Sequence, residues 1–392
     1  MDKHEYCYKL KGLFYCFIII IIIYLLCIKP NLFNIRIYKH YITLCKKMIK
    51  LYPKDEKNNE KPFFSICIPV YNMEKYIKTS IISVLNQSFR DFEILIINDY
   101  SLDNSEKIIK SLQDENHKIK LINHSENLGV YKTRVDLIKN ANGNFIIFLD
   151  PDDLFSNENL LKKLFDFNLI YNLDIVEFSI LLNFESYNNL YYPSDSQTNH
   201  FHFSDGKIIY HPELSNILFF SNNKYSKIIC RCLWNKMIRK DLLLKTINFL
   251  GYKPYQKSHF DFAEDTIINV LNFEFASNYS NLNLYGYMYN VRSNSMSHSK
   301  EEGGEMYLKM ASNIIYFYRL FYNYIKYFNK DINYLFYDLK HFDYYFEYIN
   351  ESYSSSLYKR KIINLYTEIL NEKNISKKFR QYAEKSLKKF HL

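Results

Sequence analysis

The chain has 392 residues, of which 48% are hydrophobic, so it is long enough for one large domain or two modest ones with a sizeable core. Its formal net charge is +9, but the lysines are scattered among acids and no zinc-finger or other nucleic-acid motif is found. The charge therefore indicates a solvated surface and no nucleic-acid partner. The 7 cysteines form neither a zinc-ligand pattern nor one that demands a disulfide framework.

The N-terminal segment Leu13–Ile28 is an uncharged apolar run with lysines on both sides. It is a little shorter than the roughly 20 residues of a typical membrane span, but flanking lysines can reach the interface with their side chains. A cleaved signal peptide is the alternative, and the bulky and basic residues after the run do not resemble a cleavage site. We expect residues 1–29 to form a cytosolic tail with a transmembrane anchor, and residues 30–61 to form a basic stem.

The orientation of this single-pass anchor is left open. A short span suits the thinner membranes of ER or Golgi type, where the domain after a cytosolic tail would be lumenal. More basic residues follow the span than precede it, however, which favours a cytosolic domain. The expected location is an ER- or Golgi-type membrane in a eukaryotic cell, and otherwise the plasma membrane with the catalytic domain in the cytosol.

Strand-like and helix-like segments alternate after the stem. Short apolar runs predict buried strands, helical spacing of apolar residues predicts helices, and a glycine or a polar cluster separates them. The strands are expected at 63–70, 92–97, 119–123 and 145–149, and the helices at 74–86, 105–113 and 130–139. This alternation predicts an α/β fold with a doubly wound, mostly parallel sheet.

Polar residues follow three of the predicted strands, at Tyr71-Asn72, Asn98-Asp99 and Asp150–Asp153. Ligands of doubly wound sheets bind beyond the carboxyl ends of the strands, so we expect these three segments to converge on one crevice. The sequence contains neither GxGxxG nor GxxxxGK[ST], which argues against a dinucleotide fold and a P-loop.

The segment Asp150–Asp153 places three carboxylates within four residues, directly after a buried strand. Carboxylates this close repel one another unless a cation lies between them. A divalent ion that also binds phosphate oxygens relieves the repulsion, and Mg²⁺ and Mn²⁺ prefer such oxygen ligands. The alternative is a helix N-cap, although a cap needs only one acid.

Six motifs resemble those of family-2 glycosyltransferases, which have the GT-A fold. Three lie in the first half of the chain: SICIPVYNMEKYIKTSIISVLNQSFRDFEILIINDYSLDNS, NLGVYKTR and GNFIIFLDPDD. Three follow in the order that the family shows: LWNKMIRK (233–240), AEDT (263–266) and YNVRSNSMS (289–297). The resemblance implies a GT-A domain over residues 62–300, and we expect amphipathic helices over 301–392 that pack on it.

The resemblance implies an inverting transfer of a hexose or N-acetylhexosamine from a nucleotide-diphosphate sugar, usually a UDP-sugar, to a glycan or lipid-linked acceptor, with Mn²⁺ or Mg²⁺. Carried over by motif, Asp152 is the metal ligand, and the catalytic residues are Glu264 and Asp265, with Asp265 as the base. Glu264 and Asp265 could otherwise be the cap of a helix that begins at Thr266. The nucleotide-sugar site that the motifs imply consists of Pro69, Tyr71, Glu74, Asp99, Arg134, Asp150 and Asp153.

Four residues have a weaker assignment. Trp234 is either a platform for the acceptor sugar or a core residue. Lys236 and Arg292 are candidates for the diphosphate, or ordinary surface charges. His298 could complete a metal site, but a single histidine is a weak signal.

Two positions depart from the family pattern. Tyr100 stands where the family usually has glycine, and Val135 stands where it usually has asparagine. Neither change removes a catalytic group, but the glycine permits a tight turn, so the nucleotide loop could differ. The alternative hypothesis is a catalytically inactive relative that still binds a nucleotide sugar. A nucleotidyltransferase would need a Gly-rich, basic loop after its first strand, and PVYNMEKY does not supply one.

Overall fold

The computed structural model describes residues 61–184, 190–193, 208–211, 232–250, 264–291, 322–330, 356–373 and 375–390. The chain divides into two compact units, residues 1–60 and 61–392, and all described residues belong to the second. Within these ranges, no helix combines the length and the apolar character needed to cross a membrane. The anchor predicted at Leu13–Ile28 and the stem lie outside the described residues.

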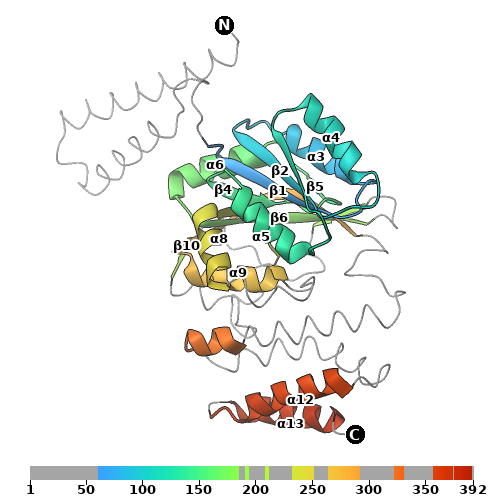
Figure 1. The fold of residues 1–392 in the computed structure, drawn as a ribbon. Coiled ribbons are helices and arrows are strands. Elements are labelled where there is room, and N and C mark those ends of the chain that lie inside the picture. Colours follow the sequence, from blue (N-terminus) through green and yellow to red (C-terminus); the bar gives the residue numbers. More distant parts are fainter. Residues whose placement is uncertain are drawn as a thin grey trace, which may run out of the picture. The chain divides into compact units, whose positions relative to one another are not determined.

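The described unit is a mixed α/β domain whose strands and helices alternate in its first half (Figure 1). Its strands are β1 (Phe64–Val70), β2 (Phe92–Asn98), β3 (Ile119–Asn123), β4 (Phe145–Phe148), β5 (Leu154–Phe155), β6 (Ile175–Phe184), β7 (Leu190–Pro193), β8 (Ile209–Tyr210), β9 (Lys236–Arg239) and β10 (Asn278–Val291). Its named helices are α3 (Ile77–Leu85), α4 (Ser105–Glu115), α5 (Val130–Asn140), α6 (Leu160–Tyr171), α8 (Lys240–Leu250), α9 (Glu264–Phe275), α12 (Ser356–Leu370) and α13 (Lys377–Phe390).

One sheet organises the domain, in the order β3-β2-β1-β4-β9-β6-β10-β5. The first four strands are parallel, β9 is antiparallel to β4 and β6, and β6 and β10 are parallel to each other. The predicted parallel, doubly wound half is therefore confirmed. Beyond β4, the sheet contains both antiparallel and parallel strand pairs, which the local sequence pattern did not indicate.

Side chains point alternately to the two faces of the sheet along each strand, so the domain has two separate cores. Ile66 and Ile68 of β1 pack in the core that also contains side chains of α3 and α6, whereas Cys67 packs in the core that contains α5, α8 and α9. Successive strand residues point to opposite faces, so a strand apolar at every position requires helices on both. The three layers that result explain why the strands read as continuous apolar runs.

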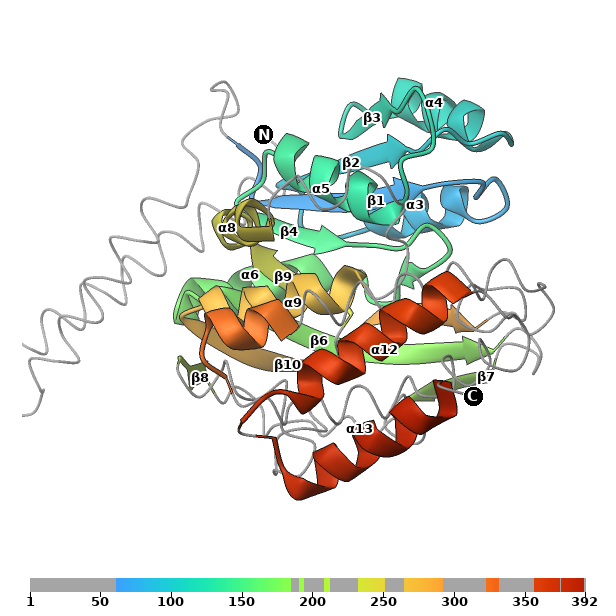
Figure 2. The same ribbon diagram turned by 60° about the horizontal axis from the view of Figure 1, so that its bottom comes forward.

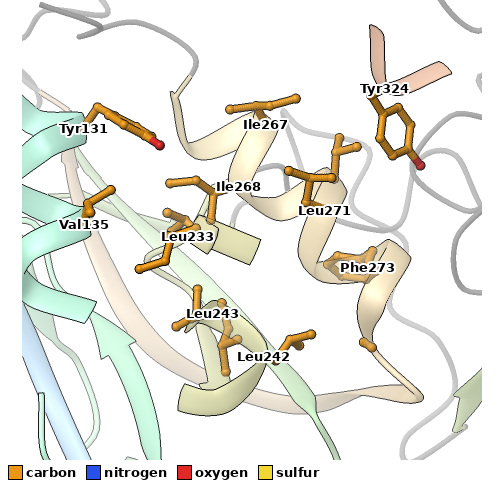
Figure 3. Close-up of a cluster of buried hydrophobic side chains, with 14 of the residues drawn as sticks. Tyr131, Val135, Leu233, Leu242, Leu243, Ile267, Ile268, Leu271, Phe273 and Tyr324 are labelled. Carbon is orange, nitrogen blue, oxygen red and sulfur yellow. The ribbon is translucent and has the colours of Figure 1, made fainter. Parts of the chain in front are cut away.

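Helices α5, α8 and α9 are held together by one of these cores. Tyr131 and Val135 of α5 lie opposite Ile267 and Ile268 of α9, with Leu233 among them (Figure 3). Burying a side chain of this size stabilises the fold by about 1.5–3 kcal/mol. This packing sets the start of α9 against α5, although the two helices are far apart in the sequence.

The described C-terminal helices share the same core. Leu365 and Tyr366 of α12 and Phe379 of α13 are buried in it, and α12 and α13 lie side by side (Figure 2). A short helical segment over 322–327 contacts α9, because Tyr324 donates a hydrogen bond to Glu274 at 2.9 Å. The prediction of C-terminal helices is confirmed within these ranges.

Candidate active site

The carboxyl ends of β1, β2 and β4 lie at one edge of the sheet, because the three strands are parallel neighbours. The loops after β1 and β2 are bonded to each other: the Leu102 amide donates to Asn72 Oδ1 at 2.8 Å, and the Asn104 amide donates to Glu74 Oε2 at 3.0 Å. Two of the three predicted strand ends thus form one platform. In this arrangement the Glu74 carboxylate orders the neighbouring loop.

Two tyrosines are exposed on this platform. Tyr71 is 43% exposed and Tyr100 is 49% exposed, whereas Pro69 is buried within β1. Tyr100 has φ +62°, in the left-handed region that glycine adopts without cost. A glycine at this position would adopt the turn without strain, whereas the tyrosine of this chain is strained.

Asp99 is buried and fixes the start of α5. Its Oδ1 accepts the Leu128 amide at 2.9 Å and lies 2.7 Å from His124 Nδ1, and its Oδ2 accepts the Gly129 amide at 2.8 Å. Gly129, with φ +84°, immediately precedes α5. Asp99, predicted to lie in the nucleotide-sugar site, thus orders the loop that leads into the helix carrying Arg134.

Arg134 joins two parts of the site. Its Nη1 donates to Glu264 Oε1 at the start of α9, and its Nη2 donates to Asp150 Oδ1 at 3.1 Å, at the end of β4. The guanidinium is buried, and its Nε has no hydrogen-bond partner among the described residues. Arg134, predicted to lie in the nucleotide-sugar site, is here a bridge between Asp150 after β4 and Glu264, the neighbour of the predicted base Asp265.

Burial and charge act against each other in this cluster. Burial alone would lower the pKa of Arg134, but Glu264 and Asp150 hold that pKa above its ordinary value. Burial raises the pKa of Glu264 to about 8, against the opposing effect of Arg134. Burial also raises the pKa of Asp265, and Arg134 is the largest influence that lowers it. Asp265 thus lies within electrostatic reach of Arg134, with its Oδ1 accepting the Thr266 amide at 2.8 Å.

Asp150–Asp153, hereafter the acid turn, is followed by β5, whereas the next helix, α6, begins only at Leu160. The helix-cap alternative for these acids is therefore wrong. Asp153, predicted to lie in the nucleotide-sugar site, is only 2% exposed, and Tyr287 of β10 donates to its carboxylate at 2.8 Å. Asp152 is half-buried, and the Asp150 side chain is 24% exposed.

The acid turn suits a metal ion that the donor's phosphates help to hold. Across the described part of the chain, no group of three or more His, Cys, Asp or Glu side chains could bind a metal by itself. Asp153 is bonded to β10 and Asp150 to Arg134, and Asp152 is the half-buried acid between them. One or two protein carboxylates, completed by water and phosphate oxygens, are what Mg²⁺ usually takes.

Two other predicted residues, one buried and one half-buried, contact groups of the chain itself. Lys236 is 0% exposed, and its ammonium donates to Cys232 O, Asn235 Oδ1 and Glu177 Oε2 at 2.7, 2.8 and 3.3 Å. A diphosphate contact is not supported by this arrangement, because all three ammonium protons have acceptors. Trp234 stacks on Tyr287 and Tyr289, with ring centroids 4.5 and 5.6 Å away.

Arg292 and His298 lie outside the described residues. The sequence did not single out His124, Tyr287 or Asn290, which bond Asp99 and the acid turn. No spacing rule marks them, since their partners come from strands that become neighbours only in the folded sheet. Asn290 lies within the YNVRSNSMS motif, which was the one available signal.

A mostly parallel sheet with an acid turn at the end of β4 and a Glu-Asp pair facing it defines a GT-A-type domain. Residues 65–246 match the family model described as glycosyl transferase family 2. These residues are therefore a family-2 glycosyltransferase domain, as the motifs of the sequence predicted.

Relatives and solved structures agree with this family. The chain is 40% identical over 103 residues to an uncharacterised glycosyltransferase of Haemophilus influenzae, covering 26% of this chain and 41% of that protein. It is 43% identical over 112 residues to the minor teichoic acid biosynthesis protein GgaA of Bacillus subtilis, covering 26% and 24%. In both cases the chain spans less than half of the relative's length.

Among solved structures, the fold is similar to S. aureus TarS 1–349 in complex with UDP-GlcNAc. The TM-score is 0.55 at 19% sequence identity, and the match covers 83% of this chain and 89% of that one. At this identity the likeness establishes the shared fold.

Proposed function

We propose that the chain is an inverting glycosyltransferase that transfers a sugar from a UDP-sugar to a glycan or lipid-linked acceptor. The observation that carries the proposal is the Arg134 bridge. It brings the acid turn and the Glu264-Asp265 pair together at the sheet edge where the nucleotide platform lies. A single displacement requires residues that position the sugar donor and a base that accepts the proton of the acceptor.

In the proposed reaction, the Asp265 carboxylate accepts the proton of the acceptor hydroxyl. The hydroxyl oxygen forms a bond to the anomeric carbon as the bond from that carbon to the diphosphate breaks. One displacement inverts the centre, so an α-linked donor gives a β-linked product. Glu264, paired with Arg134, orients the start of α9 and does not itself accept the proton.

Asp152, with Asp150 beside it, would hold a Mn²⁺ or Mg²⁺ ion together with the donor's phosphates. When bound, such an ion offsets the negative charge on the departing diphosphate. Tyr71 and Tyr100 lie exposed beside Asp99, where the motif places the base of the nucleotide. The uncovered faces of these rings supply stacking surface of the kind that nucleobases use.

The sugar and the acceptor are proposed at the level of class. TarS was solved with UDP-GlcNAc and GgaA belongs to teichoic acid biosynthesis, which supports a UDP-hexose or UDP-N-acetylhexosamine donor. Trp234 has a stacked face on β10 and remains a candidate for the acceptor side. We further propose that the segment Leu13–Ile28 anchors the protein to a membrane, which suits a lipid-linked acceptor.

The experiment is a donor screen with the full chain, Mn²⁺ and a panel of UDP-sugars, with UDP release as the readout. We expect one donor class to support turnover, and Asp152→Asn and Asp265→Asn each to abolish it. Lys132→Met, which removes a paired surface cation on α5, is the control and should leave turnover unchanged.

Two results would contradict the proposal. Wild-type turnover in both Asp152→Asn and Asp265→Asn would refute the site. Metal-dependent UDP binding without turnover on any acceptor would identify instead the catalytically inactive nucleotide-sugar-binding relative.

A further inference from the structure

Tyr287, on β10, bonds both ends of the acid turn with one hydroxyl group. It donates to Asp153 Oδ2 at 2.8 Å and accepts the Asp150 amide at 3.2 Å. The turn also has its own hydrogen bond, from the Asp153 amide to the Asp150 carbonyl at 3.0 Å. A phenol that donates to one end and accepts from the other fixes the distance between them.

Asn290, three residues further along β10, bonds the same turn twice. Its main-chain amide donates to Asp153 Oδ1 at 2.8 Å, and its side-chain Nδ2 donates to the Asp152 carbonyl at 2.6 Å. Its Oδ1 accepts Asn183 Nδ2 at 2.7 Å from the paired position on β6. This third bond fixes the orientation of the Asn290 amide, because only one orientation places oxygen toward Asn183 and nitrogen toward Asp152.

The ring of Tyr287 is itself held in place. It is 0% exposed, and Trp234 stacks on it with ring centroids 4.5 Å apart and planes inclined by 27°. Stacked aromatic pairs contribute beyond their buried area, and a fully packed ring has little freedom to turn. The hydroxyl position is therefore set by the packing between β10 and the LWNK motif, not by the acid turn it serves.

We propose that Tyr287 and Asn290 are positioning residues that shape the acid turn for the metal ion and diphosphate of the donor. They bond the Asp153 carboxylate on both oxygens, and Asn290 also holds Asp152 by its main-chain carbonyl. Groups that orient metal ligands in this way strengthen metal binding without touching the metal. The proposal rests on the proposed function, since it assumes that the turn receives the donor.

A purely structural role would give a different result, and β10 supplies a matched control. Tyr279, on the same strand, is also 0% exposed, and its hydroxyl donates to the Glu177 carboxylate at 3.3 Å. Tyr279→Phe and Tyr287→Phe each remove one buried hydroxyl that bonds a carboxylate and keep the ring. Only Tyr287→Phe alters the acid turn.

The test measures Mn²⁺ binding to the full chain in the presence of UDP, by the loss of the free Mn²⁺ signal in electron paramagnetic resonance. We expect Tyr287→Phe and Asn290→Ala to weaken Mn²⁺–UDP binding by about 10-fold or more, the usual effect of losing a group that orients a metal ligand. Tyr279→Phe should bind as the wild type does, even if its melting temperature falls by as much as that of Tyr287→Phe.

Wild-type Mn²⁺–UDP affinity in Tyr287→Phe and Asn290→Ala would overturn the positioning role and leave the proposed function intact. Failure of the wild type itself to bind Mn²⁺ with UDP would overturn the proposed donor site and this proposal with it. If Tyr287→Phe does not fold, Asn290→Ala decides, because Asn290 is only half-buried and lies outside the stacked pair of Tyr287 and Trp234.

Discussion

Arg134 has two carboxylate partners, Glu264 and Asp150, that come from opposite sides of the site. Together with Asp265 they make three acids that would repel one another, and the buried guanidinium of Arg134 offsets that repulsion. Breaking such a pair leaves an uncompensated buried charge, which is strongly destabilising. Arg134 therefore acts on the predicted base, Asp265, through its charge as well as through its position.

Replacing Arg134 with Met should move the acidic limb of the pH–rate profile to higher pH. Asp265 must be ionised to accept a proton, so activity falls as the pH drops through its pKa. Burial already raises this pKa, and Arg134 is the largest influence that lowers it, so losing Arg134 raises it further. The measurement is kcat against pH, with Lys132→Met as the control on the same helix. An unchanged limb in Arg134→Met would contradict the assignment of Asp265 as the base.

The strain at Tyr100 can be tested separately. A left-handed conformation costs a non-glycine residue about 1–2 kcal/mol, and glycine loses about 0.4–1 kcal/mol more entropy on folding. Tyr100→Gly should therefore stabilise the protein by roughly 0.5–1 kcal/mol, measured by urea denaturation. Tyr100→Ala keeps the strain and should not stabilise; an equal gain from both variants would mean that the exposed ring, not the backbone, is responsible.

At the scale of elements, the turn that leads into β4 depends on Gly143. A Cβ atom there would lie 2.5 Å from the Ser65 main-chain nitrogen and 2.6 Å from the Phe64 carbonyl carbon. Both contacts are with the backbone of β1, which cannot turn away as a side chain can. The close approach, and not a special backbone angle, explains why glycine is needed at this position.

Gly143→Ala should destabilise the protein by about 1–3 kcal/mol, the usual effect of forcing an extra methyl group into a packed site. Thermal and urea denaturation provide the measurement. Adding Ser65→Ala should not restore stability, because the shortest contact is with the main-chain nitrogen and not with the hydroxyl. Rescue by the double variant would show that the side chain of Ser65 sets the limit.

The elements of the first half were predictable, because each strand is a short apolar run and each connection carries a turn residue. The predicted strands and helices before Asp150 agree with the structure to within three residues at each boundary. The mixed half was not predictable in the same way. Strand β9 is only Lys236–Arg239, and its pairing with β4 and β6 comes from the tertiary fold.

At the scale of the whole molecule, one core connects the sheet to the described C-terminal helices. Leu365 of α12 is 0% exposed in the core that also contains α5 and α9. Leu365→Ala should cost about 2–5 kcal/mol, as large-to-small changes in a packed core do. Trp234 is the 1 tryptophan of the chain, so its fluorescence reports unfolding of the sheet. The midpoint of thermal unfolding followed by this signal should shift to lower temperature in Leu365→Ala. Arg360→Ala, on an exposed part of α12, should change stability by less than about 0.5 kcal/mol.

A different outcome would separate the C-terminal helices from the domain. If Leu365→Ala lowered the helical circular dichroism signal at a temperature where Trp234 fluorescence was unchanged, α12 and α13 would unfold as a unit of their own. The shared core makes the joint shift the expected result.

The sequence by itself determined the α/β class, the family and the segments that carry chemistry, because these depend on local patterns: apolar runs, turn residues and the ordered motifs. Only the tertiary structure decided what surrounds each acid. Asp153 is bonded by Tyr287 of β10, Glu264 is paired with Arg134, and Asp265 lies within the electrostatic influence of the same arginine. The physical reason is that a carboxylate's environment is set by neighbours distant in the sequence, such as Tyr287 and Arg134, which only the folded sheet brings within hydrogen-bonding distance.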